Sequence, residues 1–133
     1  MQWVWIGIGG ALGSLLRFLL QGRAQTAYGG LFPLGTLGVN LIGSAAIGFL
    51  GGWFISAPVP TNLRLFLMVG ILGGFTTFSS FSLDALTLIR SGHARMALSY
   101  MLASNVLGVA LAFGGFLCAQ ALARALAIGN QAG

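Results

Sequence analysis

Acidic side chains are almost absent from this sequence, and lysine is absent altogether. Asp84 is the single carboxylate, and His93, in a predicted loop, is the single histidine. An acid–base pair, or a nucleophile with its base, cannot be assembled from so few groups. The composition therefore predicts that the protein is not an enzyme.

Cysteine is equally scarce, because Cys118 is the only one in the chain. This excludes a disulfide within the chain and a metal site built from several cysteines. The six arginines are scattered singly along the chain, which argues against a nucleic-acid partner. We interpret them as anchors at the surface of a lipid bilayer.

Apolar residues make up most of the rest. Hydrophobic residues account for 57% of the chain and charged residues for 5%, whereas soluble domains carry roughly 25% charged residues. The mean hydropathy of +0.96 also indicates a lipid environment. We predict an all-α integral membrane protein with about four transmembrane helices, since one span needs roughly 20 apolar residues. The expected spans cover about residues 3–20, 35–55, 65–89 and 96–125 of a single domain, 1–133.

Small residues recur four positions apart within these spans. The pairs are Gly9 with Gly13, Gly10 with Ser14, Gly48 with Gly52, and Gly70 with Gly74. This spacing lets helix backbones approach closely in lipid, where burial of apolar surface does not drive association. Together with short connections, which make consecutive helices antiparallel neighbours, it predicts a tightly packed bundle.

The third span is predicted to be broken in the middle of the membrane. Its centre, residues 70–82, is crowded with glycine, threonine and serine, and its three glycines followed by two threonines are poor helix formers. Non-helical backbone at membrane depth persists only where it is buried in protein or lines a cavity. Carbonyl groups freed by such a break can hold a hard cation such as sodium.

The distribution of the arginines does not determine the orientation of the chain in the membrane. They divide between Arg64 and Arg124 on the side of the N-terminus, and Arg17, Arg23, Arg90 and Arg95 on the opposite side. Orientation normally follows the excess of positive charge on the cytoplasmic side. So weak a bias permits insertion both ways, and with it an antiparallel homodimer.

Polar residues within the spans are the candidate functional residues, because they are costly in lipid unless they face a partner or a water-filled path. They are Asn40, Asp84, Tyr100, Ser104, Asn105 and the five hydroxyls of residues 76–82. Phe75, Phe78 and Phe81 recur every third residue among those hydroxyls. Such a stripe ordinarily indicates core packing. Ring edges, hydroxyls and the Asn40 amide would, however, also suit a small anion.

Once these residues are considered together, the chain resembles the small fluoride channel family, often called Fluc, over nearly its whole length. Three segments carry the resemblance. They are GGALG at residues 9–13 leading to Arg17, GTLGVNLIG at residues 35–43, and GGFTTFSSFS at residues 73–82.

The resemblance implies an antiparallel, dual-topology homodimer in the cell membrane that passes fluoride passively through two pores. It implies a fluoride pathway lined by Asn40, Phe78, Phe81, Ser79, Ser80, Tyr100 and Ser104. Arg17 matches the family's vestibule arginine, and the backbone carbonyls of Gly73 and Thr76 match a structural sodium site at the dimer centre.

The chain departs from the family pattern at three positions. Ser80 stands where threonine is usual and keeps the hydroxyl, whereas Gly108 lacks a hydroxyl that some members have. Asp84 stands where glutamate is common and is one methylene shorter, so its role is left undecided.

Two other interpretations stay open from the residues alone. A proton-coupled small multidrug exporter needs a titrating carboxylate, typically in the first span, and Asp84 in the third span is the only candidate. A scaffold subunit without transport activity would explain the glycines but not the hydroxyl cluster.

Overall fold

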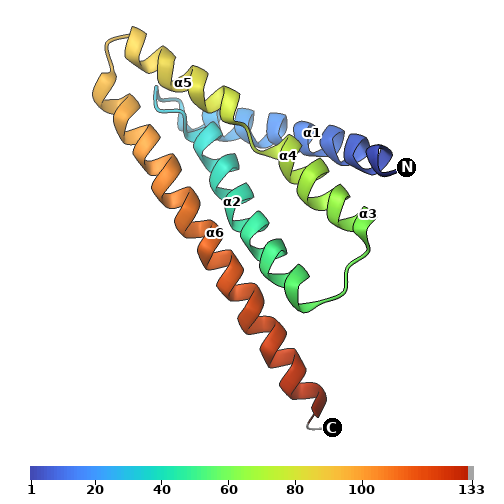
Figure 1. Ribbon diagram of the computed structural model, residues 1–133. Helices are drawn as coiled ribbons and strands as arrows, with labels where there is room; N and C mark the ends of the chain where they lie inside the picture. The colour runs from blue at the N-terminus through green and yellow to red at the C-terminus, as the bar shows by residue number, and fades with distance from the viewer. Residues whose placement is uncertain (132–133) are drawn as a thin grey trace.

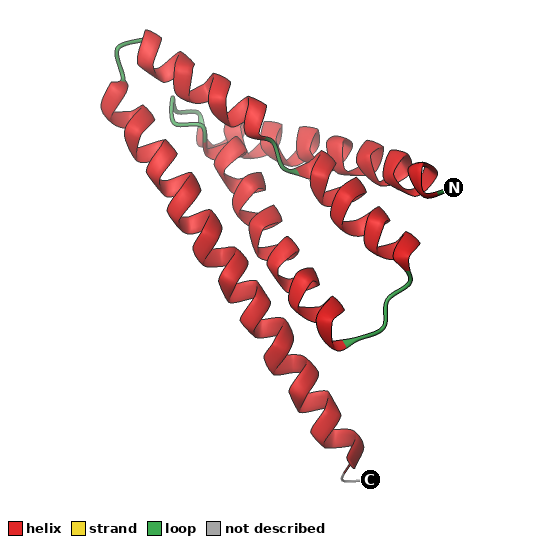
Figure 2. Cartoon of the chain, in the orientation of Figure 1, coloured by secondary structure: helices red, strands yellow, loops and turns green. Residues whose placement is uncertain are grey.

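The computed structural model describes the backbone of residues 1–131 and the side chains of residues 1–127, and all its regular structure is helical (Figure 2). The elements are α1 (Gln2–Tyr28), α2 (Leu34–Ser56), α3 (Thr61–Arg64), the π-helical segment η1 (Leu65–Ile71), α4 (Leu72–Phe75), α5 (Phe78–Arg90) and α6 (Ala94–Gln131). Four stretches are long and apolar enough to cross a membrane: Gln2–Tyr28, Leu34–Ser56, Thr61–Arg90 and Ala94–Ala127. The predicted all-helical protein with four long apolar segments is confirmed.

The first and last helices are longer than the expected spans. The α1 helix continues through Gln21 and Gln25, because polar side chains do not interrupt a helical backbone, and it ends at Gly29, whose φ of 67° is left-handed. The α6 helix has 38 residues, or about 57 Å at about 1.5 Å per residue. It is therefore longer than one perpendicular crossing of a hydrocarbon core roughly 30 Å thick.

Helices α2 and α6 lie along each other over most of the length of α2 (Figure 1). A β-carbon added at Gly48 would overlap the carbonyl of Ala112, and one added at Gly52 would lie 2.6 Å from the carbonyl oxygen of Phe116. The two backbones are therefore in direct contact, as the spacing of small residues predicts.

Helix α1 packs on the other side of the molecule, against η1 and α4. A β-carbon at Gly9 would lie 2.5 Å from the carbonyl oxygen of Phe66, and one at Gly13 would overlap the carbonyl of Ile71. A β-carbon added at Gly74 on α4 would likewise overlap the carbonyl of Gly10. This contact fixes the height of α4 along α1.

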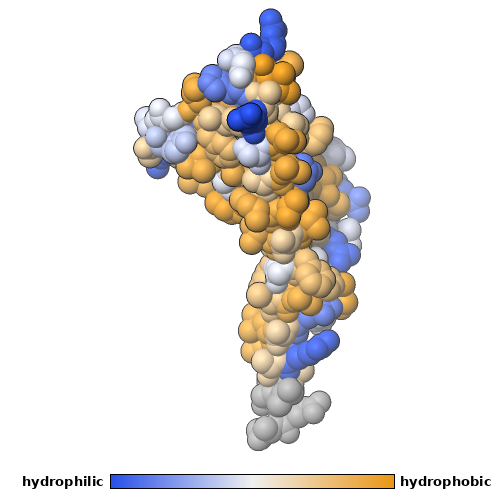
Figure 3. All heavy atoms as spheres, turned by 90° about the vertical axis from the view of Figure 1, so that its left-hand side faces the viewer, coloured by the Kyte–Doolittle hydropathy of each residue, from blue (hydrophilic) through white to orange (hydrophobic). Residues whose placement is uncertain are grey.

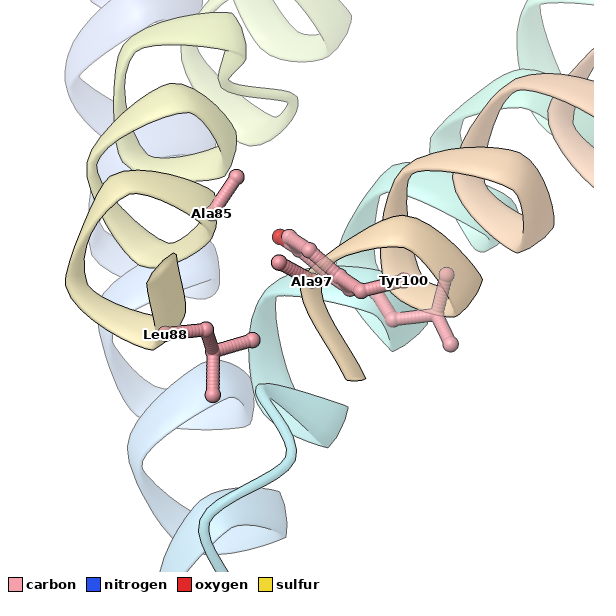
Figure 4. Packing of buried hydrophobic residues seen from close by; sticks show 5 residues of the cluster. Ala85, Leu88, Ala97 and Tyr100 are labelled. Atoms are coloured by element: carbon pink, nitrogen blue, oxygen red, sulfur yellow. The ribbon is translucent and has the colours of Figure 1, made fainter. Parts of the chain in front are cut away.

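A small buried cluster joins the ends of α2, α5 and α6 (Figure 4). It consists of Leu37, Ala85, Leu88, Ala97 and Tyr100. Tyr100 on α6 is fully buried, and its hydroxyl points toward α5. The outer surface is different in kind, because large apolar side chains such as Phe18 and Val109 are exposed (Figure 3). A surface of this kind suits lipid, and the chain is a multi-pass membrane protein.

Candidate functional site

The helical path is interrupted between α4 and α5. Thr76 (φ −85°, ψ 155°) and Thr77 (φ −149°, ψ 118°) have extended backbone, and α5 begins at Phe78. The Thr77 side chain accepts a hydrogen bond from the backbone N–H of Ser80 at 3.1 Å, which caps the new helix. One threonine of the glycine- and threonine-rich run therefore starts the helix that follows it.

Asn40 on α2 holds this interruption from one side. Its Nδ2 donates to the carbonyl oxygen of Thr77 at 3.1 Å, and its Oδ1 accepts from the Thr77 N–H at 2.8 Å. Both polar groups of one extended residue are thus satisfied by one side chain. An amide nitrogen carries two hydrogens, so Asn40 keeps one donor for another partner.

Arg17 and Ser14 on α1 hold the interruption from the opposite side. Arg17 Nε donates to the carbonyl oxygen of Gly74 at 3.1 Å, and Ser14 Oγ lies 3.5 Å from the same oxygen. A positive charge at the carboxyl end of a helix is favourable, because the last carbonyl groups carry partial negative charge. Arg17 is half-buried here, with its charge at the end of α4.

The two residues whose carbonyls are predicted to bind sodium, Gly73 and Thr76, lie at this same point, and the carbonyls of their neighbours Leu72 and Gly74 already accept hydrogen bonds. The carbonyl of Leu72 accepts from the Thr76 N–H at 3.0 Å and from the Thr76 hydroxyl at 2.9 Å, and that of Gly74 accepts from Arg17. Gly73 is exposed, and a β-carbon added there would meet nothing within 4 Å. Gly73 therefore faces away from the rest of the protomer.

A cavity of about 270 Å³ opens beside the interruption. It is lined by Asn40, Gly43, Ser44, Ile47, Leu72, Thr76, Thr77, Phe78, Phe81, Ser104 and Asn105. Ser104 Oγ is buried there and has no hydrogen-bond partner among the described residues. An unpaired buried hydroxyl is costly unless a ligand or water uses it. Ser44 also lines the cavity, although nothing in its local sequence singles it out.

The phenylalanines do not form one stripe. Phe75 ends α4 and is buried, whereas Phe78 begins α5 and is 79% exposed. The rings of Phe78 and Phe81 lie 5.5 Å apart between centroids, and those of Phe81 and Tyr100 lie 5.3 Å apart. The interruption turns Phe75 away from the other two, which a count along an unbroken helix does not reveal.

The serines after the interruption are occupied locally. Ser79 Oγ lies 3.2 Å from the hydroxyl of Thr77, and Ser80 Oγ accepts from that hydroxyl at 3.1 Å. Neither serine lines the cavity of about 270 Å³. Part of the hydroxyl cluster therefore serves the start of α5.

Asp84 and Tyr100 meet away from that cavity. Asp84 Oδ2 accepts from the hydroxyl of Thr36 at 2.6 Å and is 3.4 Å from the hydroxyl of Tyr100. Gln21 Nε2 donates to Thr36 Oγ1 at 3.0 Å. Sequence reasoning missed Thr36 and Gln21, because neither is unusual in its own helix and only the contact between helices brings them to Asp84.

Comparison with known proteins finds one matching family model and several similar proteins. The family model described as CrcB-like protein, Camphor Resistance (CrcB), matches residues 4–116. A protein of Aquifex aeolicus named fluoride-specific ion channel FluC is 42% identical over 118 residues, covering 88% of this chain and 95% of the relative. Proteins with the same name from Parabacteroides distasonis and Thermus thermophilus are 47% and 44% identical, over 83% and 91% of this chain and 86% and 97% of their own lengths.

These relatives are named as ion channels, which agrees with the predicted absence of enzyme activity. The matched segment contains the interruption, Asn40, Arg17 and Ser104. It also covers nearly all of the first three apolar segments and much of the fourth. The chain therefore belongs to the CrcB family.

Proposed function

We propose that the protein is a fluoride-selective ion channel that exports fluoride passively across the cell membrane. The observation that carries the proposal is the cavity of about 270 Å³ beside the interruption, where Ser104 Oγ has no partner among the described residues and Asn40 keeps a free amide hydrogen. The identity of the ion as fluoride is inferred from the names of the relatives. Hydrogen-bond donors replace part of the hydration shell of a small anion without a fixed positive charge that would trap it.

The rings of Phe78 and Phe81 contribute to the same route. The edges of Phe78 and Phe81 carry the positive end of the aromatic quadrupole, which attracts an anion weakly. Both rings line the cavity. In the proposed pathway the ion passes these rings and the hydroxyl of Ser104, whereas Tyr100, Ser79 and Ser80 lie outside the lining of this cavity and would support the pathway from its flanks.

The functional unit in this proposal is an antiparallel, dual-topology homodimer with two pores. Two facts support it: both ends of the bundle carry arginines, with a weak bias of four against two, and Phe78 is 79% exposed although it borders the cavity. A second copy would cover Phe78 and close the open side of the pathway. The interruption would then lie at mid-membrane depth, enclosed by protein on both sides.

A structural sodium ion completes the proposed dimer. The carbonyl oxygens of Gly73 and Thr76 are suitable hard ligands, and Gly73 faces away from the protomer. Two carbonyls are too few for such an ion, but the same pair from a second copy would double the number. The sodium would tie the two interruptions together at the dimer centre.

Fluoride efflux from proteoliposomes, followed with a fluoride electrode, tests the function directly. Purified protein should release trapped fluoride far faster than protein-free vesicles do, and should release chloride much more slowly. Removal of sodium during purification and assay should reduce the rate. Vesicles that leak fluoride no faster than empty ones would refute the proposal.

Ser104→Ala should slow fluoride efflux by about tenfold to a hundredfold while leaving the fold intact. The hydroxyl has no partner among the described residues, so its removal costs the fold no hydrogen bond there. A hydrogen bond to a charged group contributes about 1.5–3 kcal/mol, which is enough to lower the rate at the step where the ion sits. The efflux rate and the melting temperature in detergent are measured on the same preparation.

Ser99→Ala is the matched control for that variant. Ser99 also lies on α6, is exposed, and donates to the carbonyl of Met96. Its efflux should equal that of the unmodified protein. Equal rates for both serine variants would remove Ser104 from the ion pathway.

Phe78→Ile and Phe81→Ile should each slow or stop fluoride transport, because isoleucine fills similar space without a polarised ring edge. Phe78 should have the smaller effect on folding, since its ring lies beside that of Phe81 and is otherwise largely exposed in the protomer. Efflux and the size-exclusion profile are compared. Aggregation of both variants, in place of intact dimers with low flux, would indicate that the rings act in packing.

A further inference from the structure

A second cavity, of about 260 Å³, lies at the end of the bundle where α2 begins and α5 ends. It is lined by Gln21, Gln25, Leu31, Pro33, Thr36, Asp84, Thr87, Leu88 and Ser91. Asp84 is the only carboxylate side chain of the protein, and it is half-buried in this wall. None of the aromatic residues of the proposed fluoride pathway lines this space.

The hydrogen bonds around Asp84 have a fixed direction. The hydroxyl of Thr36 has a single hydrogen, and its 2.6 Å contact uses that hydrogen on the carboxylate. The 3.0 Å contact between Thr36 and Gln21 must therefore be donated by the amide nitrogen. The amide oxygen of Gln21 can therefore still accept a hydrogen bond or bind a cation.

The hydroxyls that line the α5 side of the cavity have also donated their hydrogens. Thr87 donates its hydroxyl hydrogen to the carbonyl of Leu83 at 2.8 Å, and Ser91 donates its own to the carbonyl of Thr87 at 2.8 Å. Both hydroxyls have used their hydrogens on the helix backbone and offer only lone pairs elsewhere. This is opposite to the first cavity, where the hydroxyl hydrogen of Ser104 is unused.

The charge of Asp84 has no cationic partner within the described side chains. Its partners are two hydroxyls, Thr36 and Tyr100, and both contacts are made by Oδ2. Arg17, one turn from Gln21 on α1, is directed to Gly74 instead. A charged group in so apolar a bundle is costly unless an opposite charge compensates it.

We infer that this second cavity is a binding site for a hard monovalent cation, held by Asp84 together with neutral oxygens of Gln21, Thr87 and Ser91. Oxygen ligands suit hard cations and not soft metals. One carboxylate balances one positive charge. The site is separate from the sodium proposed at Gly73 and Thr76, and it does not depend on fluoride transport.

Thallium(I), an alkali-ion substitute with strong anomalous scattering, tests the inference in crystals of the full-length protein soaked in thallium acetate. An anomalous peak is expected in the second cavity beside Asp84. The variant Asp84→Asn keeps an oxygen to accept from Thr36 but removes the charge. It should lose that peak, and calorimetry in detergent should show at least about tenfold weaker thallium binding at this site.

Two further variants distinguish direct binding of the cation from an indirect effect on the structure. Thr87→Val keeps the shape but removes one neutral oxygen, and should weaken binding less than Asp84→Asn does. Ser82→Ala, on the exposed side of α5 and outside both cavities, should leave it unchanged. No peak at the highest thallium concentration the crystals tolerate, or a peak that persists in Asp84→Asn, would overturn the inference. Fluoride efflux from the same preparations reports separately on the proposed channel function.

Discussion

Asn40→Asp is expected to abolish fluoride efflux. Two effects add. The carboxylate cannot donate to the Thr77 carbonyl, which Asn40 Nδ2 contacts at 3.1 Å, so the clamp on the interruption becomes a repulsion. It also places negative charge in the wall of the proposed anion path. Two like charges about 4 Å apart repel by about 4 kcal/mol at an effective dielectric constant of about 20, which corresponds to a rate about a thousandfold lower.

The fluoride-electrode assay on proteoliposomes measures this effect, and Asn62→Asp provides the control. Asn62 is exposed on α3 and does not line the cavity, so the same exchange of amide for carboxylate occurs outside the proposed anion path. That variant should retain its efflux. Asn40→Leu separates the two effects, because it removes the clamp without adding charge and should retain more efflux than Asn40→Asp. Undiminished efflux in Asn40→Asp would exclude this residue from the mechanism.

The division of the chain into helices follows from composition alone. A mean hydropathy of +0.96 and runs of about twenty apolar residues leave no alternative to membrane-spanning helices. The contacts made by Gly13, Gly48 and Gly74 also agree with the spacing of small residues. These features depend only on neighbours within one helix, which is why they are visible in the sequence.

The pairing of side chains between helices could not be predicted in this way. Asn40 is conspicuous as an amide in an apolar span, but its partners, the N–H and carbonyl of Thr77, depend on how α2 is rotated against the interruption. The resemblance to the fluoride channel family implies that Tyr100 and Ser104, four residues apart on one helix, both line the pathway. The structure instead buries Tyr100 against Asp84, and only Ser104 lines the first cavity.

Because of the interruption, equal spacing of residues along the sequence does not place them on one face of a helix. Phe75, Phe78 and Phe81 are evenly spaced, yet the two extended residues Thr76 and Thr77 place Phe75 on a different helix segment. A period assumes a continuous helix axis. Where the axis breaks, the residues on either side must be assigned from contacts with other helices, and here those contacts come from α1 and α2.

Gly13→Ala is expected to cause the largest loss of stability of any single methyl group added to α1. The new β-carbon would overlap the carbonyl of Ile71 and lie 2.9 Å from the Phe75 backbone nitrogen. Both are backbone atoms, so no side chain can rotate to make room. Overpacking of this kind costs about 3 kcal/mol, and the melting temperature in detergent, followed by tryptophan fluorescence, should fall clearly.

Gly7→Ala is the matched control, because a β-carbon at Gly7 meets nothing within 4 Å on the same helix. Alanine is the better helix former by about 1 kcal/mol, so this variant should melt at the same temperature or slightly higher. Equal melting temperatures for the two variants would mean that the backbones of α1 and α4 are not in close contact at Gly13. A shifted α1 would also carry Ser14 and Arg17 away from the Gly74 carbonyl. Any Gly13→Ala protein that still folds should therefore lose fluoride efflux as well, because the contact that packs the bundle also supports the interruption.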